Sequence, residues 1–176
     1  EFGNDSSIAL YFLEAERLTD LGNEAFEAVG TTGGNDSMAT AETLLIGQSD
    51  VFVTGDHTLG GTGISDRDYY VVTVPHGQGI RVEIIEGDND PAKRCVDDSL
   101  DSEITLFSSV GAVLANDDDD GRGWCSLIDG TGSSPRDPGA RNQTGSSATY
   151  FIEVRESDIA NAPDDVFTYR LAVTIR

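Results

Sequence analysis

The stretch FTYRLAVTIR, residues 167–176, decides the fold of this chain. Its apolar side chains fall on every second residue, at Tyr169, Leu171, Val173 and Ile175. Successive side chains of an extended chain point to opposite faces, so this spacing predicts a β-strand with one buried face. The stretch TYFIEVRE, residues 149–156, repeats the pattern. The C-terminal part of the chain therefore supplies two half-buried strands.

Further short strands are predicted through the middle of the chain, separated by turns rich in Gly, Asn and Asp. Their ranges are 44–48, 50–55, 69–75, 79–87, 103–109, 112–116 and 125–130. No helical pattern separates these strands, which argues against a parallel sheet built from strand–helix–strand units. The sequence predicts an all-β fold, an antiparallel β-sandwich.

The N-terminal segment has a different period. In residues 8–29 the apolar side chains recur at spacings of three, four and seven, which is typical of one face of a helix. The sequence GTTGGNDS, residues 30–37, then resembles a hinge or loop. We therefore divide the chain into an N-terminal helical extension, residues 1–32, and a β-sandwich domain, residues 33–176. The helix either packs on that domain or links it to a longer parent protein.

Acidic residues dominate the charge of the chain. Asp and Glu number 32 against 11 Lys and Arg, for a formal net charge of −21. Nucleic acids and anionic membranes need basic patches, so both are poor partners. No run approaches the roughly 18 apolar residues of a membrane-spanning helix, and no membrane insertion is predicted. Two interpretations of the excess charge stay open: a surface suited to high salt, or oxygen-rich sites for Ca²⁺.

The two cysteines, Cys95 and Cys125, flank the most acidic part of the chain. A disulfide between them is predicted for an oxidising compartment, with two unpaired thiols as the alternative. A zinc site needs more Cys and His than the chain contains.

A run of four aspartates, Asp117–Asp120, lies in LANDDDDGRGWC, residues 114–125. Asn116, Asp118 and Asp120 alternate ahead of a glycine, as oxygen ligands do in the first half of a Ca²⁺ loop. Leu127 stands where a helix–loop–helix Ca²⁺ site would have its Glu, so further ligands must come from elsewhere. The predicted ligands within the loop are Asn116, Asp117, Asp118, Asp119 and Asp120, and Asp101 is the predicted ligand from outside it. A solvated acidic loop without metal is the alternative.

Several motifs together resemble the bacterial pre-peptidase C-terminal domain. They are NDSMATAETL (35–44), VTGDHTLGGTGISDRDYYVVTVP (53–75), GIRVEII (79–85) and LDSEITLFSSVGAVLANDDDDG (100–121). Their order and spacing carry the resemblance, which covers roughly residues 33–176. The resemblance implies a jelly-roll-like β-sandwich and a secreted, non-catalytic accessory module of a bacterial protein.

The resemblance also implies Ca²⁺ ligands. Carried over by position, they are Asn35, Asp36, Asp66 and Asp68. Gly33 and Gly34 stand where Ca²⁺-binding collagenase modules have Glu, so this chain departs from the family pattern there.

Motifs for catalysis are missing from the sequence. It contains no G-x-S-x-G and no H-E-x-x-H, and its two histidines lie in turn-like contexts. We therefore expect no enzyme. The leading hypothesis is an extracellular, Ca²⁺-dependent module of a larger secreted or surface protein, such as an adhesin or hydrolase, with a peptide, protein or polysaccharide ligand. The alternative is a structural spacer of a secreted peptidase whose loops Ca²⁺ makes rigid.

Overall fold

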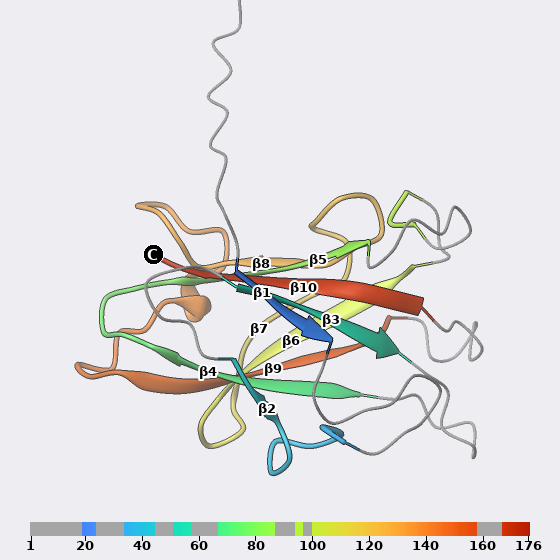
Figure 1. The fold of residues 1–176 in the computed structure, drawn as a ribbon. Coiled ribbons are helices and arrows are strands. Elements are labelled where there is room, and N and C mark those ends of the chain that lie inside the picture. Colours follow the sequence, from blue (N-terminus) through green and yellow to red (C-terminus); the bar gives the residue numbers. More distant parts are fainter. Residues whose placement is uncertain are drawn as a thin grey trace, which may run out of the picture.

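The chain folds into two five-stranded sheets packed face to face, seen in a computed structural model (Figure 1). The structure describes residues 19–23, 34–44, 51–57, 67–86, 94–96, 100–157 and 167–176, and for 19–23 and 51–57 the backbone alone. Its strands are β1 (Thr19–Asn23), β2 (Glu42–Thr43), β3 (Val51–His57), β4 (Asp68–Val74), β5 (Ile80–Glu86), β6 (Ser102–Ser108), β7 (Val113–Asp117), β8 (Leu127–Asp129), β9 (Ala148–Glu156) and β10 (Phe167–Ile175).

The first sheet has the strand order β1-β3-β10-β5-β8, and the second has β2-β4-β9-β6-β7. Along the chain, strands alternate between the two sheets at nearly every connection, as in a jelly roll. β9 and β10 lie at the centres of the two sheets, and their pairings with both neighbours are antiparallel. The predicted all-β, jelly-roll-like sandwich is confirmed. Two edge strands, β1 and β2, pair in parallel with β3 and β4.

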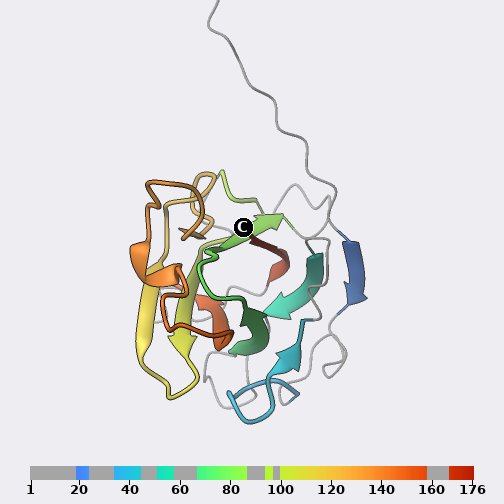
Figure 2. The ribbon, with the colours of Figure 1, turned by 90° about the vertical axis from the view of Figure 1, so that its left-hand side faces the viewer.

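The core fills the space between the sheets, which Figure 2 shows from one end. In β4 every second residue is buried, and in β10 the side chains at 169, 171 and 173 are fully buried, as the alternation predicted. The largest fully buried side chains are Tyr70, Tyr169, Phe167, Ile80, Ile84, Leu100, Ile104, Leu106, Ile128, Ile152 and Leu171. Non-local pairing of this kind makes the fold depend on contacts distant in sequence.

The predicted helix over residues 8–29 is wrong for its described part. Thr19–Asn23 form strand β1, which pairs with β3 and so joins the first sheet. Thr19, Asp20, Gly22 and Asn23 are all weak helix formers, so the 3.6-residue period lacked support from the residues themselves. The open edge of β3 supplies the backbone partners that β1 uses instead. Residues 8–18 and 24–29 lie outside the described residues.

The long connection between β8 and β9, residues 130–147, contains a single-turn 3-10 helix, η1 (Pro138–Ala140). After it, the Asn142 side chain is buried and donates from Nδ2 to the Val74 carbonyl over 2.7 Å. This bond ties the connection to the end of β4. None of the described residues forms a helix long and apolar enough to cross a membrane.

Candidate functional site at one end of the sandwich

Both acidic clusters singled out in the sequence lie at the same end of the second sheet. The strand register places Asp68 opposite Val154, Val154 opposite Ile104, and Ile104 opposite Asp117. All four side chains are buried. Neighbouring strands are about 4.8 Å apart, so three strand spacings separate Asp68 from Asp117 by roughly 14 Å. The two clusters are therefore distinct sites on opposite sides of one sheet.

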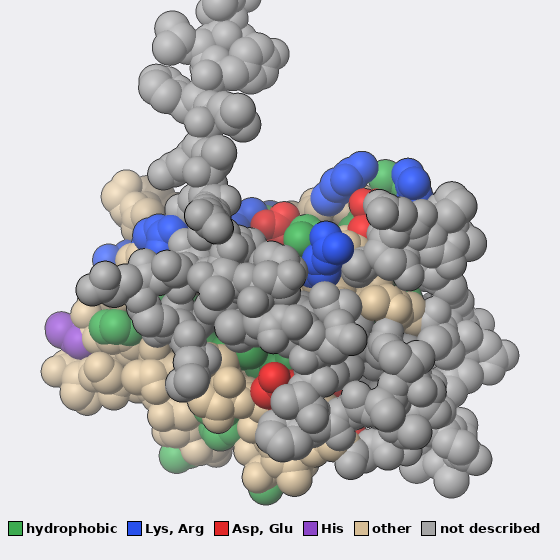
Figure 3. Space-filling view, viewed as in Figure 1, with side chains coloured by type: hydrophobic (Ala, Val, Ile, Leu, Met, Phe, Trp, Pro, Cys, Tyr) green, Lys and Arg blue, Asp and Glu red, His purple; other side chains and the backbone are tan. Residues whose placement is uncertain are grey.

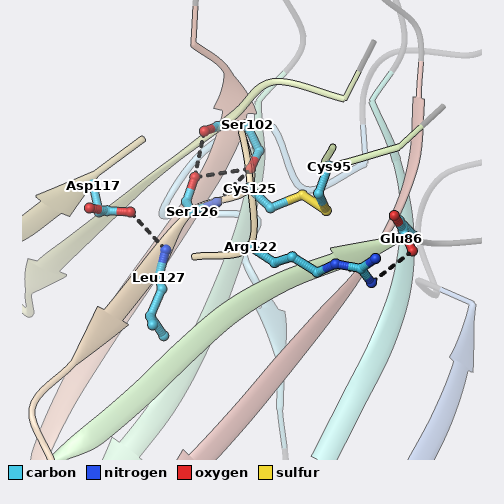
Figure 4. Close-up of a disulfide and its surroundings, with 8 residues drawn as sticks. All are labelled: Glu86, Cys95, Ser102, Asp117, Arg122, Cys125, Ser126 and Leu127. Carbon is cyan, nitrogen blue, oxygen red and sulfur yellow. Dashed lines mark hydrogen bonds and ion pairs between the residues drawn. A yellow bond between two sulfur atoms is a disulfide. The ribbon is translucent and has the colours of Figure 1, made fainter. Parts of the chain in front are cut away.

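Asp117 closes the sandwich at the edge where β7 faces β8. Its Oδ2 accepts a hydrogen bond from the backbone N–H of Leu127 over 2.7 Å (Figure 4). The same oxygen accepts a second bond from the backbone N–H of Asp120 over 3.0 Å. The side chain is 8% exposed. Burial raises the pKa of Asp117 to about 6. The two backbone N–H groups lower this pKa, but their effect is smaller than that of burial. This carboxylate is thus a structural acceptor that joins one sheet to the other.

Asn116 and Asp120 are also bonded to the protein's own groups. Asn116 Nδ2 donates to Glu103 Oε1 over 2.7 Å and to Thr105 Oγ1 over 2.8 Å, on the neighbouring strand β6. Asp120 forms an ion pair with Arg136, whose Nη1 also donates to the Asp120 carbonyl over 2.9 Å. Part of the charge of the four aspartates is therefore neutralised inside the molecule.

Asp118 and Asp119 remain exposed, and no described side chain forms an ion pair with either. The pKa of Asp119 is raised by desolvation and by the charges of Asp118 and Asp120. Asp101 is half-buried just before β6, and its carbonyl accepts from the Ser157 N–H over 3.1 Å. Within the described residues, no three His, Cys, Asp or Glu side chains come together as a metal site.

The predicted disulfide is confirmed. Cys95 and Cys125 are bonded, with their Cα atoms 5.1 Å apart, and both are buried (Figure 4). Beside them Ser126 N donates to Ser102 Oγ over 3.1 Å, and both serines are fully buried. The disulfide and this serine pair hold the acidic loop against the start of β6.

The other acidic cluster lies at the start of β4. We define it as the Asn35 corner, made of Asn35, Asp36 and Asp68. The Asn35 carbonyl accepts from the Tyr69 N–H over 2.9 Å, which sets residue 35 against the start of β4. Asn35 is fully buried, and neither polar atom of its side chain has a hydrogen-bond partner among the described residues. Asp36 is exposed. Three of the four residues carried over by resemblance are thus brought to one place; Asp66 lies outside the described residues.

Asp68 is fully buried and is oriented by a chain of hydroxyl groups. Tyr169 donates from its hydroxyl to Asp68 Oδ2 over 2.6 Å, and the hydroxyls of Tyr169 and Tyr70 lie 2.8 Å apart. This chain crosses the core from β10 to β4. Sequence reasoning assigned Tyr169 to the core by its alternation and missed its hydroxyl. The signal was present, because a buried tyrosine hydroxyl ordinarily needs a partner.

Comparisons with known proteins give a distant likeness to a solved structure. No protein-family model matches the sequence, and no curated protein matches it. Among solved structures, the chain is similar to PliG of Aeromonas hydrophila, a periplasmic lysozyme inhibitor of g-type lysozyme. The identity is 16% and the TM-score 0.46, over 77% of this chain and 96% of PliG.

Proposed function

We propose that this chain is a non-catalytic extracellular module of the pre-peptidase C-terminal type that binds Ca²⁺ at the Asn35 corner. The observation that carries the proposal is the buried Asn35 side chain without a hydrogen-bond partner among the described residues. A buried polar group that makes no hydrogen bond costs about 1–3 kcal/mol. A cation bound by the amide oxygen would remove the part of that cost that falls on Oδ1.

The donors at the corner suit Ca²⁺, which prefers carboxylate and carbonyl oxygens. Asn35 Oδ1 and the carboxylates of Asp36 and Asp68 would hold the ion. Tyr169 already donates to Asp68 Oδ2 and so fixes the orientation of that carboxylate. Asp66, on the segment leading into β4, is the further ligand that the resemblance implies. The ion would supply a positive charge that ties the loop before β2 to the start of β4.

In this proposal the protein works outside the cytoplasm of a bacterial cell. It forms part of a larger secreted or surface protein. The Cys95–Cys125 disulfide supports an oxidising environment. The ligand of the module is a peptide, protein or polysaccharide. His76 supports a non-catalytic role, because its Nδ1 accepts from the Gly145 N–H over 3.1 Å and so belongs to an exposed turn.

A structural spacer is the second candidate function. The observation that favours it is the bonding of the acidic loop, where Asp117 joins the two sheets and Arg136 neutralises Asp120. In that case Ca²⁺ at the Asn35 corner would stiffen the module, and no ligand would bind.

Thermal unfolding tests the proposal in excess chelator, in CaCl₂, in MgCl₂ and in NaCl of matched ionic strength. At roughly 100-fold saturation, Ca²⁺ should add about 2.7 kcal/mol to the free energy of unfolding. Asp36→Asn should weaken Ca²⁺ binding measured by calorimetry, while the matched variant Asp118→Asn should leave it unchanged, since both carboxylates are exposed. Equal stabilisation by NaCl, or no Ca²⁺ binding at millimolar concentration, would count against the proposal and favour a salt-adapted surface.

A further inference from the structure

The outward face of the second sheet carries a stripe of apolar side chains. The strand register aligns one residue from each of β4, β9, β6 and β7, namely Val71, Phe151, Phe107 and Val113. The first three alternate with buried residues along their strands, so their side chains point away from the core. Val113 is 61% exposed, and the other three are half-buried. We call these four residues the Phe107 stripe.

A second aromatic ring from β4 extends this surface. The ring centroids of Tyr69 and Phe107 are 6.5 Å apart, and the ring planes meet at 32°. Because β9 lies between the strands that carry them, the two rings lean towards each other across β9. The Tyr69 hydroxyl donates to Glu153 Oε1 over 2.9 Å, which fixes the orientation of its ring. A side chain fixed in this way loses little conformational freedom on binding.

The charges that these strands direct outward are matched one to one. Glu103 on β6 forms an ion pair with Arg155 on β9. Glu153 on β9 forms one with Arg67, just before β4, over 2.8 Å. In the side view of Figure 3, the described surface around and below β4 shows hydrophobic and uncharged side chains, and the basic side chains in view lie in the upper half. In a chain of net charge −21, a face of paired charges favours an uncharged partner.

The Phe107 stripe is one side chain wide on the inner strands. Phe151 lies between the outward-facing Thr149 and Glu153, and Thr105 precedes Phe107 on the same face of β6. An α-helix is about 10–12 Å across with its side chains and buries a broad apolar stripe, so it needs a wider patch. An extended peptide adds to the edge of a sheet, where it finds free backbone groups, whereas β9 and β6 are inner strands. The width and position of the stripe therefore favour a narrow polymer that brings its own hydrogen-bonding groups.

A neutral sugar chain has these properties. A pyranose ring has apolar C–H groups on its faces and hydroxyls around its rim. The C–H groups carry a small positive charge and pack on the negative face of an aromatic ring. Polar side chains border the stripe on both sides, with Thr73 and Thr149 on one and Glu153 and Asn116 on the other. They are partners for the hydroxyls of the rim.

From these observations we infer that the Phe107 stripe binds a neutral polysaccharide, with Phe107, Phe151 and Tyr69 packing against the sugar rings. The inference rests on the proposed function, because it names polysaccharide as the ligand class of that module. The stripe lies on the outward face of the sheet, whereas Asp68 of the Asn35 corner is buried on the inward face. The two sites are therefore open to separate tests.

Electrophoresis in native gels that contain a soluble polymer tests the inference. The neutral probes are hydroxyethylcellulose, arabinoxylan and galactomannan, and the comparisons are polygalacturonate and gelatin. We expect at least one neutral polysaccharide to slow the protein more than either comparison does. Calorimetry with that polysaccharide should give the same affinity in 0.15 and 0.5 M NaCl, because salt screens charged contacts and leaves packing on aromatic rings unaffected.

Two variants and a matched control locate the binding surface. Phe151→Thr and Val113→Asp should each weaken polysaccharide binding at least about tenfold. Val113 is largely exposed, so its variant keeps the fold and decides the question even if Phe151→Thr unfolds. The control is Val110→Asp, the same change at a valine that is 87% exposed in the turn between β6 and β7, and it should bind as the unaltered protein does.

Several results would overturn the inference. They are the absence of slowing by all three neutral polysaccharides, greater slowing by polygalacturonate or gelatin, unchanged affinity in Val113→Asp, and an equal loss in Val110→Asp. Ca²⁺ titration of the same samples separates the two proposals. A protein that binds Ca²⁺ but no neutral polysaccharide would refute the stripe alone, and one that binds the polysaccharide but no Ca²⁺ would refute the Asn35 corner alone.

Discussion

The most informative perturbation is the removal of the charge at Asp117. Its Oδ2 accepts two backbone hydrogen bonds at the seam between the sheets. Asp117→Asn keeps a carbonyl oxygen that can accept both bonds, but it removes the buried charge. Asp117→Ala removes the acceptor as well, and so leaves the N–H groups of Leu127 and Asp120 without their partner.

The size of the charge effect follows from the pKa. Burial, together with the nearby charge of Asp120, raises the pKa of Asp117 to about 6, roughly two pH units above its usual value. One unit corresponds to 1.36 kcal/mol, so ionised Asp117 destabilises the folded state by about 3 kcal/mol relative to its protonated form. Because the pKa is raised on folding, stability from this group is fully present below about pH 4. It is lost as the pH rises through about 6.

Urea unfolding in calcium-free buffer between pH 4 and pH 8 measures these effects. Asp117→Asn should be more stable than the unaltered protein by about 2–3 kcal/mol at pH 8, with the difference vanishing near pH 4. Asp117→Ala should lose about 1–3 kcal/mol at pH 4, where the charge plays no part. If Asp117→Asn were as destabilised as Asp117→Ala at pH 8, the reasoning would be wrong. The backbone N–H groups would then require the carboxylate charge itself.

Three further outcomes follow from the same end of the molecule. Replacing both Cys95 and Cys125 by Ser should lower the free energy of unfolding by about 3–4 kcal/mol, since the loop they close spans 30 residues; an unchanged urea midpoint would contradict this. Gly123→Ala should lower the melting temperature more than Gly132→Ala. Both glycines have positive φ, but only at the first would the new Cβ collide with backbone. Tyr169→Phe should cost about 1–3 kcal/mol in urea unfolding, because it leaves a buried carboxylate without its hydroxyl donor, and a loss below 0.5 kcal/mol would show that the bond is dispensable.

The strands of the core were predictable because their signal is local. A buried strand face needs an apolar side chain at every second residue, and β4 and β10 carry that pattern in their own sequence. β1 was not predictable in this way. Its residues fit a helical period, yet its structure comes from pairing with β3, a strand about 30 residues further along the chain.

The candidate sites were predictable in part. The family resemblance pointed to Asn35, Asp36 and Asp68, and the structure brings Asn35 against the start of β4, beside Asp68. For the aspartate loop, the alternation of side chains suggested a common centre. Instead Asn116 bonds to β6 and Asp120 to Arg136, partners that no pattern within the loop reveals. The exposure of Trp124 was not predictable from the sequence, because exposure depends on what packs over a side chain.

The sequence by itself determined the all-β class, most strand positions, the disulfide partners and the excess of negative charge. These follow from side-chain period and composition, which are properties of neighbouring residues. The tertiary structure alone decided which carboxylates became buried, which were neutralised, and where a tryptophan stayed exposed. Burial and hydrogen bonding depend on groups from distant strands. Asp68 and Asp117, for example, are connected through cross-strand neighbours on four strands, β4, β9, β6 and β7. The chemistry of each aspartate therefore depends on the strand that folding places beside it.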